Sequence, residues 1–134
     1  EDLLGPIPYL IFYLLCGIIA ALAQIAADPT SIIPNVGASG AISGVLAGYL
    51  VLLPTGTVRL FIFFGFFYRI TKIPALLFIT VWFVIQLFSG VASLGVVAEG
   101  GGVAYWAHIG GFIAGLLLAF AYKTIMRRHL FPSH

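Results

Sequence analysis

The chain has 134 residues, of which 62% are hydrophobic and 7% are charged, and its formal net charge is +2. Soluble domains average roughly 45–50% apolar and about 25% charged residues, so this composition excludes an ordinary soluble domain and indicates a membrane protein. The only cysteine, Cys16, lies inside an apolar block, which excludes an intrachain disulfide and makes a metal cluster implausible. We expect neither a metal nor a cofactor.

Four apolar blocks approach the roughly 17–25 residues that a helix needs to cross a bilayer. They cover residues 7–27, 37–53, 74–96 and 104–126. The sequence therefore predicts an all-α, polytopic membrane helix bundle that forms a single domain over residues 1–134.

The first two spans are separated by a stretch that forbids regular helix. Pro6 and Pro8 suit the first turn of the first helix, which is expected to end near Ala27. The sequence "ADPTSIIPNVG" that follows holds two prolines and an asparagine. The second span of about 17 residues would be roughly 26 Å long, shorter than the roughly 30 Å hydrocarbon core. One of its ends is therefore expected to lie below the membrane surface.

Segment 58–70, "VRLFIFFGFFYRI", is apolar but too short to cross, and Arg59, Arg69 and Lys72 bracket it. We expect it to lie in the cytoplasmic interface with its phenylalanines facing the acyl chains. A small buried hairpin is the alternative.

The basic residues gather on one side once the four spans are threaded back and forth. Every lysine and arginine falls there: Arg59, Arg69, Lys72, Lys123, Arg127 and Arg128. The other side has only Asp28 and Glu99. The positive-inside rule then predicts a cytoplasmic C-terminus in a multi-pass protein of the cell membrane. The basic residues are interpreted as topology and headgroup anchors, not as a nucleic-acid site.

Small residues recur every four positions in the second and fourth spans. The two rows are Gly40, Gly44 and Gly48 in the second span and Ala107, Gly111, Gly115 and Ala119 in the fourth. Such rows form grooves that let helix backbones touch in lipid, so these spans are predicted to pack on each other. Packing alone is a sufficient explanation for most of these glycines.

His108 and Ser39 are the candidate reactive residues. An ionisable residue within a span is costly and usually has a partner or a function, although a lone histidine can also bond a carbonyl or reach headgroups. Serine alone is ordinary in small-residue interfaces. Both lie near the starts of helices that begin on the outward side, where an imidazole could activate the hydroxyl. Backbone N–H groups at Gly37, Ser39 and Gly40 would then face an oxyanion.

These residues belong to motifs that resemble a known family. "GASGAISG" at 37–44 resembles the G-x-S-G motif of rhomboid intramembrane serine proteases, and "AHIGGFIAG" at 107–115 looks like their A-H-x-x-G-x-x-x-G motif. "ED" at 1–2, "YLIFYLLCGIIAALAQ" at 9–24 and "QLFSG" at 86–90 also resemble bacterial members. The resemblance runs through nearly the whole chain.

The resemblance implies cleavage of transmembrane protein substrates by a Ser–His dyad that needs no aspartate. It assigns Ser39 as the nucleophile and an oxyanion donor, and His108 as the general base. It also implies that Trp82 and Gln86 of the third span act as a gate and that the 97–103 loop, with Gly101, acts as a cap. Gln86 as an interhelical hydrogen-bond donor and the loop as a plain connector are the alternatives.

Two departures from the family pattern bear on these expectations. The family has a six-helix core whose second helix carries an H-x-x-x-N motif, and neither that motif nor two earlier helices occur here, so we expect the four-helix C-terminal part. Ser43 stands where many relatives have an aromatic residue. The rival hypothesis is a non-catalytic rhomboid-like subunit that binds transmembrane helices or is a scaffold for a larger membrane complex. Besides substrates and the lipid bilayer, the expected partners are the missing N-terminal helices or other membrane subunits. A transporter is the weakest alternative, because no pair of broken helices is evident.

Overall fold

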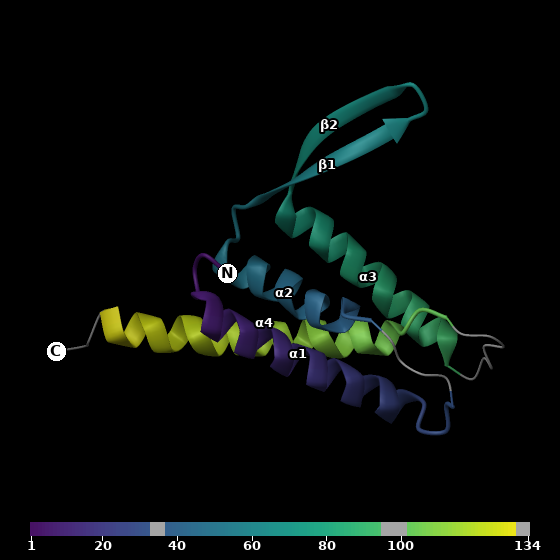
Figure 1. The fold of residues 1–134 in the computed structure, drawn as a ribbon, viewed down its shortest axis with the longest axis horizontal. Coiled ribbons are helices and arrows are strands. Elements are labelled where there is room, and N and C mark those ends of the chain that lie inside the picture. The colour runs from purple at the N-terminus through teal and green to yellow at the C-terminus, as the bar shows by residue number, and fades with distance from the viewer. Residues whose placement is uncertain (33–36, 95–101, 131–134) are drawn as a thin grey trace.

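The computed structural model describes residues 1–32, 37–94 and 102–130, and in these ranges it has four helices and one two-stranded hairpin (Figure 1). In chain order the elements are α1 (Pro6–Ala27), α2 (Ser39–Leu52), β1 (Thr57–Phe64), β2 (Phe67–Pro74), α3 (Ala75–Ser93) and α4 (Tyr105–Leu130). The architecture is that of a membrane helical bundle with a small sheet attached.

Three of the helices are long and apolar enough to cross a membrane. They are α1 with 22 residues, α3 with 19 and the Tyr105–Met126 part of α4 with 22. The second helix has 14 residues and is about 21 Å long, shorter than the 37–53 span predicted for it. It begins late because Gly37 holds a φ of +138°, which no helix permits, and it ends before Pro54.

The 58–70 segment forms the hairpin, which the all-α prediction missed. β1 and β2 pair antiparallel from Thr57 opposite Pro74 to Phe64 opposite Phe67. Gly65 supplies the positive φ, +63°, that suits a two-residue hairpin turn. Aromatic and β-branched residues favour strands, which explains why this short apolar run is not helical.

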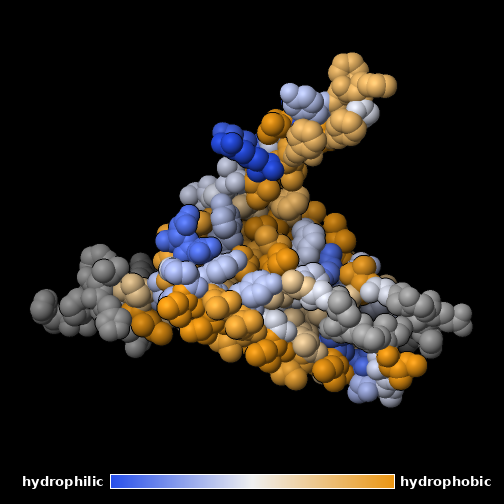
Figure 2. All heavy atoms as spheres, viewed as in Figure 1, coloured by the Kyte–Doolittle hydropathy of each residue, from blue (hydrophilic) through white to orange (hydrophobic). Residues whose placement is uncertain are grey.

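The hairpin is exposed rather than buried, which corrects the alternative stated for this segment. Phe66 at the turn is fully exposed, and Phe61, Phe63 and Phe64 are each about two-thirds exposed. The hairpin projects sideways from the helices (Figure 1), and hydrophobic atoms cover its tip while hydrophilic atoms gather nearer its base (Figure 2). Its placement in the membrane interface stays a prediction.

Close backbone contact joins α2 to α4. A Cβ atom on Gly111 would overlap the carbonyl oxygen of Gly40, and a Cβ on Gly115 would overlap the carbonyl oxygen of Gly44. From the first contact to the second, the residue number rises by four in both helices. The two helices therefore run parallel and begin on the same side of the bundle.

The first helix covers the other side of these glycines. The three glycines of α2 meet α1 in reverse order of the chain: Gly40 meets Ala20, Gly44 meets Cys16 and Gly48 meets Phe12. Gly48 thus serves the contact with α1. The first helix is antiparallel to α2, and a larger residue in the row would separate them.

The third helix packs on α4 through a small apolar core. The rings of Phe83 and Phe112 stack with centroids 4.0 Å apart, and Ile79 is 1% exposed beside Ala47 and Phe112. These contacts place α3 along the same part of α4 that holds the sequence motif at 107–115.

The hairpin begins at the end of the bundle where the N-terminus lies (Figure 1), and Arg59 pairs with Lys72 in the half of the hairpin nearer its base. At this end of the bundle the Lys123 amine donates a hydrogen bond to the carbonyl oxygen of Val51 at 2.9 Å. A cation at the C-terminal end of α2 also complements the helix dipole. The ends of α1 and α3 lie at the opposite end, so the threading inferred from charge agrees with the helix directions.

Replacing Gly111 by alanine tests the α2–α4 contact. We expect Gly111→Ala to destabilise the protein by about 1–3 kcal/mol, because the new methyl group meets a backbone carbonyl that cannot rotate away. This loss exceeds the helix-propensity gain of about 1 kcal/mol. Thermal unfolding in detergent measures it, with Gly102→Ala as the control, since a Cβ there meets nothing within 4 Å. Equal unfolding temperatures for the two variants would contradict the contact.

Cysteine labelling in intact cells tests the orientation predicted from the charges. In a Cys16→Ala background, we expect an impermeant thiol reagent to label Thr30→Cys and to spare Thr55→Cys, both of which are exposed positions. Labelling of position 55 alone would place the basic end outside the cell and reverse the topology.

Candidate active site

Ser39 and His108 lie within hydrogen-bond distance, although they are 69 positions apart in the sequence. Ser39 is the first residue of α2, and His108 is in the first turn of α4. The Ser39 Oγ is 2.9 Å from the His108 Nε2. The serine is exposed, whereas the histidine is 9% exposed. The parallel contact of Gly40 with Gly111 brings the starts of the two helices to one depth and so makes this pairing possible.

Three further side chains hold His108. The Gln86 Oε1 is 2.7 Å from the His108 Nδ1, and the Trp82 ring lies against the imidazole with centroids 5.8 Å apart. The Ser43 hydroxyl, fully buried, donates to the His108 carbonyl oxygen at 2.6 Å. Many relatives have an aromatic residue at the position of Ser43. In this chain the aromatic ring that contacts His108 is that of Trp82 on α3.

The N-terminus of α2 presents backbone donors beside the Ser39 hydroxyl. The first bond of the helix runs from the Ile42 N–H to the Ala38 carbonyl oxygen at 3.0 Å, and no side chain caps the helix. The amides of the first helical turn, at Ser39 and Gly40, have no acceptor within their own helix. Gly37 is close by, since a Cβ built on it would lie 3.7 Å from the Ser39 Oγ. Such amides can stabilise a negatively charged oxygen.

A groove of about 370 Å³ between α1 and α2 leads to the Ser39 hydroxyl. It is largely apolar, with Tyr13 and Gly37 on its walls and Ala107 at its α4 side. Among the described residues that line it, neither Trp82 nor Gln86 is present. Entry past α3 stays a prediction, and the expected cap residue Gly101 lies outside the described residues.

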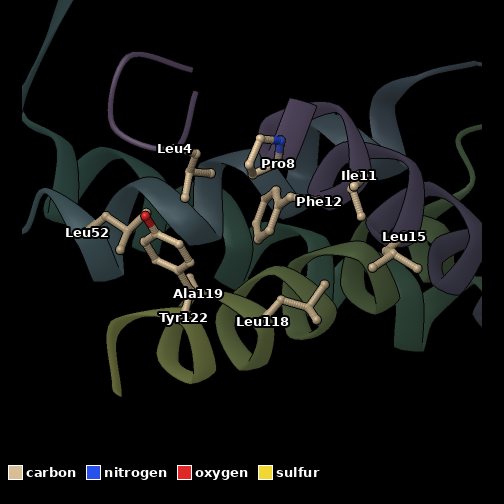
Figure 3. A pocket seen from close by; sticks show the side chains of 9 residues that line it. All are labelled: Leu4, Pro8, Ile11, Phe12, Leu15, Leu52, Leu118, Ala119 and Tyr122. Carbon is tan, nitrogen blue, oxygen red and sulfur yellow. The ribbon is translucent and has the colours of Figure 1, made fainter. Parts of the chain in front are cut away.

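A second groove, of about 250 Å³, lies at the opposite end of α2 (Figure 3). Leu52, the last residue of α2, and Phe12 point into it, and the Tyr122 hydroxyl is the polar side-chain group drawn there. Among the described residues that line this groove, the others are apolar, and neither Ser39 nor His108 is present.

Two polar contacts near His108 were not anticipated from the sequence. The Ala107 N–H donates to the Gln24 Oε1 at 3.2 Å, which ties the start of α4 to α1. The Trp106 Nε1–H donates to the Gly90 carbonyl oxygen at 3.1 Å, which ties it to α3. The sequence feature that could have indicated these contacts is an amide or indole side chain within an apolar span, because such groups need hydrogen-bond partners in lipid.

Asp28 accepts a hydrogen bond from Thr30 at 3.3 Å and lies in a turn.

The comparison with protein-family models finds a match to the Rhomboid domain over residues 1–124. Comparisons with curated proteins and with solved structures find no match.

The two serines of the motif should differ in their effect on stability. We expect Ser43→Ala to cost about 1 kcal/mol, because it removes a buried hydrogen bond to the His108 carbonyl. Ser39→Ala should cost less, since that hydroxyl is exposed. Unfolding of both variants in the same detergent makes the comparison. An equal or larger loss for Ser39→Ala would indicate that Ser39 has a structural role.

Proposed function

The chain belongs to the rhomboid family, and we propose that it cleaves transmembrane protein substrates, with Ser39 as the nucleophile and His108 as the general base. The rhomboid family generally comprises intramembrane serine proteases. The observation that carries the proposal for this chain is the 2.9 Å contact between the Ser39 Oγ and the His108 Nε2. A serine becomes nucleophilic when a neutral imidazole accepts its proton.

This geometry supports the following reaction. The His108 Nε2 takes the hydroxyl proton as the Ser39 Oγ attacks the scissile carbonyl carbon. The backbone N–H groups at the start of α2, with Ser39 and Gly40, bind the oxygen that becomes negative. When the peptide bond breaks, His108 gives the proton to the leaving amine, and an ester remains on Ser39. Water then attacks the ester carbonyl while His108 takes a proton from it, and His108 returns this proton to the Ser39 Oγ as the ester bond breaks and the new carboxyl end of the substrate leaves.

The length of α2 supports hydrolysis within the membrane. At about 21 Å the helix is shorter than the hydrocarbon core of about 30 Å, so its first residue can lie below the surface. The exposed Ser39 hydroxyl and the groove beside it give a substrate segment access to the nucleophile. With the basic end in the cytoplasm, the dyad lies toward the extracytoplasmic side of the cell membrane.

The outer surface of α1 supports a site surrounded by lipid or by further helices. Its exposed side chains are large and apolar, and they include Ile7, Leu10, Leu14, Ile18 and Leu22. Such a face suits acyl chains, earlier helices of the same protein or other membrane subunits. The rival function, a rhomboid-like subunit that only binds transmembrane helices, uses the same surfaces without the dyad.

Labelling with a fluorophosphonate probe tests the proposal. In the natural full-length protein we expect the probe to modify Ser39 and not Ser43, whose hydroxyl is buried and donates to a carbonyl. Ser39→Ala and His108→Ala should each abolish labelling, since the two residues of a dyad act as a unit. Ser43→Ala is the matched control and should still be labelled, because the Ser43 hydroxyl bonds the backbone carbonyl of His108 and neither nitrogen of its ring. Absence of labelling in a folded wild-type protein would favour the scaffold function.

A further inference from the structure

We propose that Gln86 is a positioning residue for the base: its side-chain carbonyl oxygen accepts the Nδ1–H of His108 and so keeps the Nε2 lone pair directed at Ser39. This inference rests on the proposed function of the dyad. It assigns Gln86 a different role from the substrate gate that the family resemblance implied. Gln86 has no contact with the reacting atoms and acts only through His108.

The geometry places Gln86 on the side of the imidazole opposite Ser39. The Gln86 Oε1 and the His108 Nδ1 are 2.7 Å apart, and the two residues are 8% and 9% exposed. Each ring nitrogen therefore has one protein partner, Gln86 at Nδ1 and Ser39 at Nε2. A buried hydrogen bond is electrostatically stronger than one in water, so this contact can decide how the ring is protonated.

The chemistry of a neutral imidazole makes the direction of this bond decisive. One ring nitrogen carries a hydrogen and donates, and the other accepts. If the Gln86 carbonyl accepts from Nδ1–H, Nε2 is the acceptor and can take the Ser39 proton. If the amide NH₂ of Gln86 donated to Nδ1 instead, Nε2 would carry the hydrogen and could not act as a base. Only the carbonyl arrangement is compatible with the dyad.

Packing contacts of the third helix with α4 hold Gln86 in this place. Trp82 lies one turn earlier on the same helix face and packs its ring against His108. Phe83 stacks on Phe112 of α4 at 4.0 Å and fixes the two helices side by side. The hydrogen bond between Gln86 and His108 thus joins two helices that are packed against each other. This packing keeps Gln86 in place, so that the bond can fix the orientation of the His108 ring.

Three variants separate positioning from general packing. We expect Gln86→Leu in the full-length protein to lower kcat for cleavage of a transmembrane substrate at least about tenfold, with KM unchanged, because Gln86 does not line the groove at Ser39. Gln86→Glu should retain most of the activity, since a carboxylate accepts the same bond. Gln24→Leu is the matched control: it removes a glutamine that bonds the neighbouring residue, Ala107, and should leave kcat unchanged.

Nitrogen-15 NMR of histidine-labelled protein reads the tautomer directly and does not require activity. The chain has only three histidines, and the spectrum of a His108→Ala variant identifies the signals of His108. We expect hydrogen on Nδ1 in the wild type and in Gln24→Leu, and a shift of hydrogen to Nε2 in Gln86→Leu. Hydrogen on Nε2 in the wild type, or Nδ1–H retained in Gln86→Leu, would overturn the inference.

The two measurements also separate this inference from the proposed function. A wild-type protein that cleaves, with Gln86→Leu cleaving equally fast, rejects the role of Gln86 and leaves the dyad standing. A wild-type protein that does not cleave rejects the protease, and the tautomer then still decides whether Gln86 accepts from His108.

Discussion

The contact between the backbones of α2 and α4 is the constraint on which the rest of the structure depends. Helices in lipid gain little from burying apolar side chains against one another, so close packing and hydrogen bonds must hold them together. The carbonyl oxygens of Gly40 and Gly44 occupy the space where Cβ atoms of Gly111 and Gly115 would stand. This approach sets two parallel helices side by side with their first turns at one depth. The Ser39 hydroxyl and the His108 ring meet as a consequence of that packing.

Hydrogen bonds from two helices, α2 and α3, then fix His108 of α4 within the bundle. Gln86 and Ser39 bond the two ring nitrogens of His108, and Ser43 bonds its carbonyl oxygen. In the described part of the chain, no buried side-chain nitrogen or oxygen lacks a partner. An unpaired polar group is costly in a low-dielectric interior, so a fully paired cluster is stable where a partly paired one would not be. The same bonds that make the histidine tolerable in lipid direct one of its nitrogens toward the serine.

The long helices and the contact between α2 and α4 could be predicted from the sequence. The apolar blocks are long enough to cross a membrane, and the four-residue glycine repeats match the period of the α-helix. The hairpin could be named only as an alternative, and wrongly as a buried one, since a short apolar run of about 13 residues fits a helix or strands equally well. The late start of α2 depends on the backbone of Gly37, which periodicity does not reveal. Motif spacing led to Ser39 and His108 as one hypothesis. The sequence did not identify the partner of Gln86. A single polar residue on an apolar helix indicates that its side chain needs a hydrogen bond, but not which residue forms it.

Proteolysis in a reconstituted bilayer tests the central claim most directly. The natural full-length protein, its Ser39→Ala variant and a model transmembrane substrate would be placed in liposomes, and the products followed by mass spectrometry. A dyad on Ser39 predicts cleavage by the wild type and an intact substrate with the variant. An intact substrate with a wild-type protein that melts as a folded species would contradict the account, as would equal cleavage by Ser39→Ala.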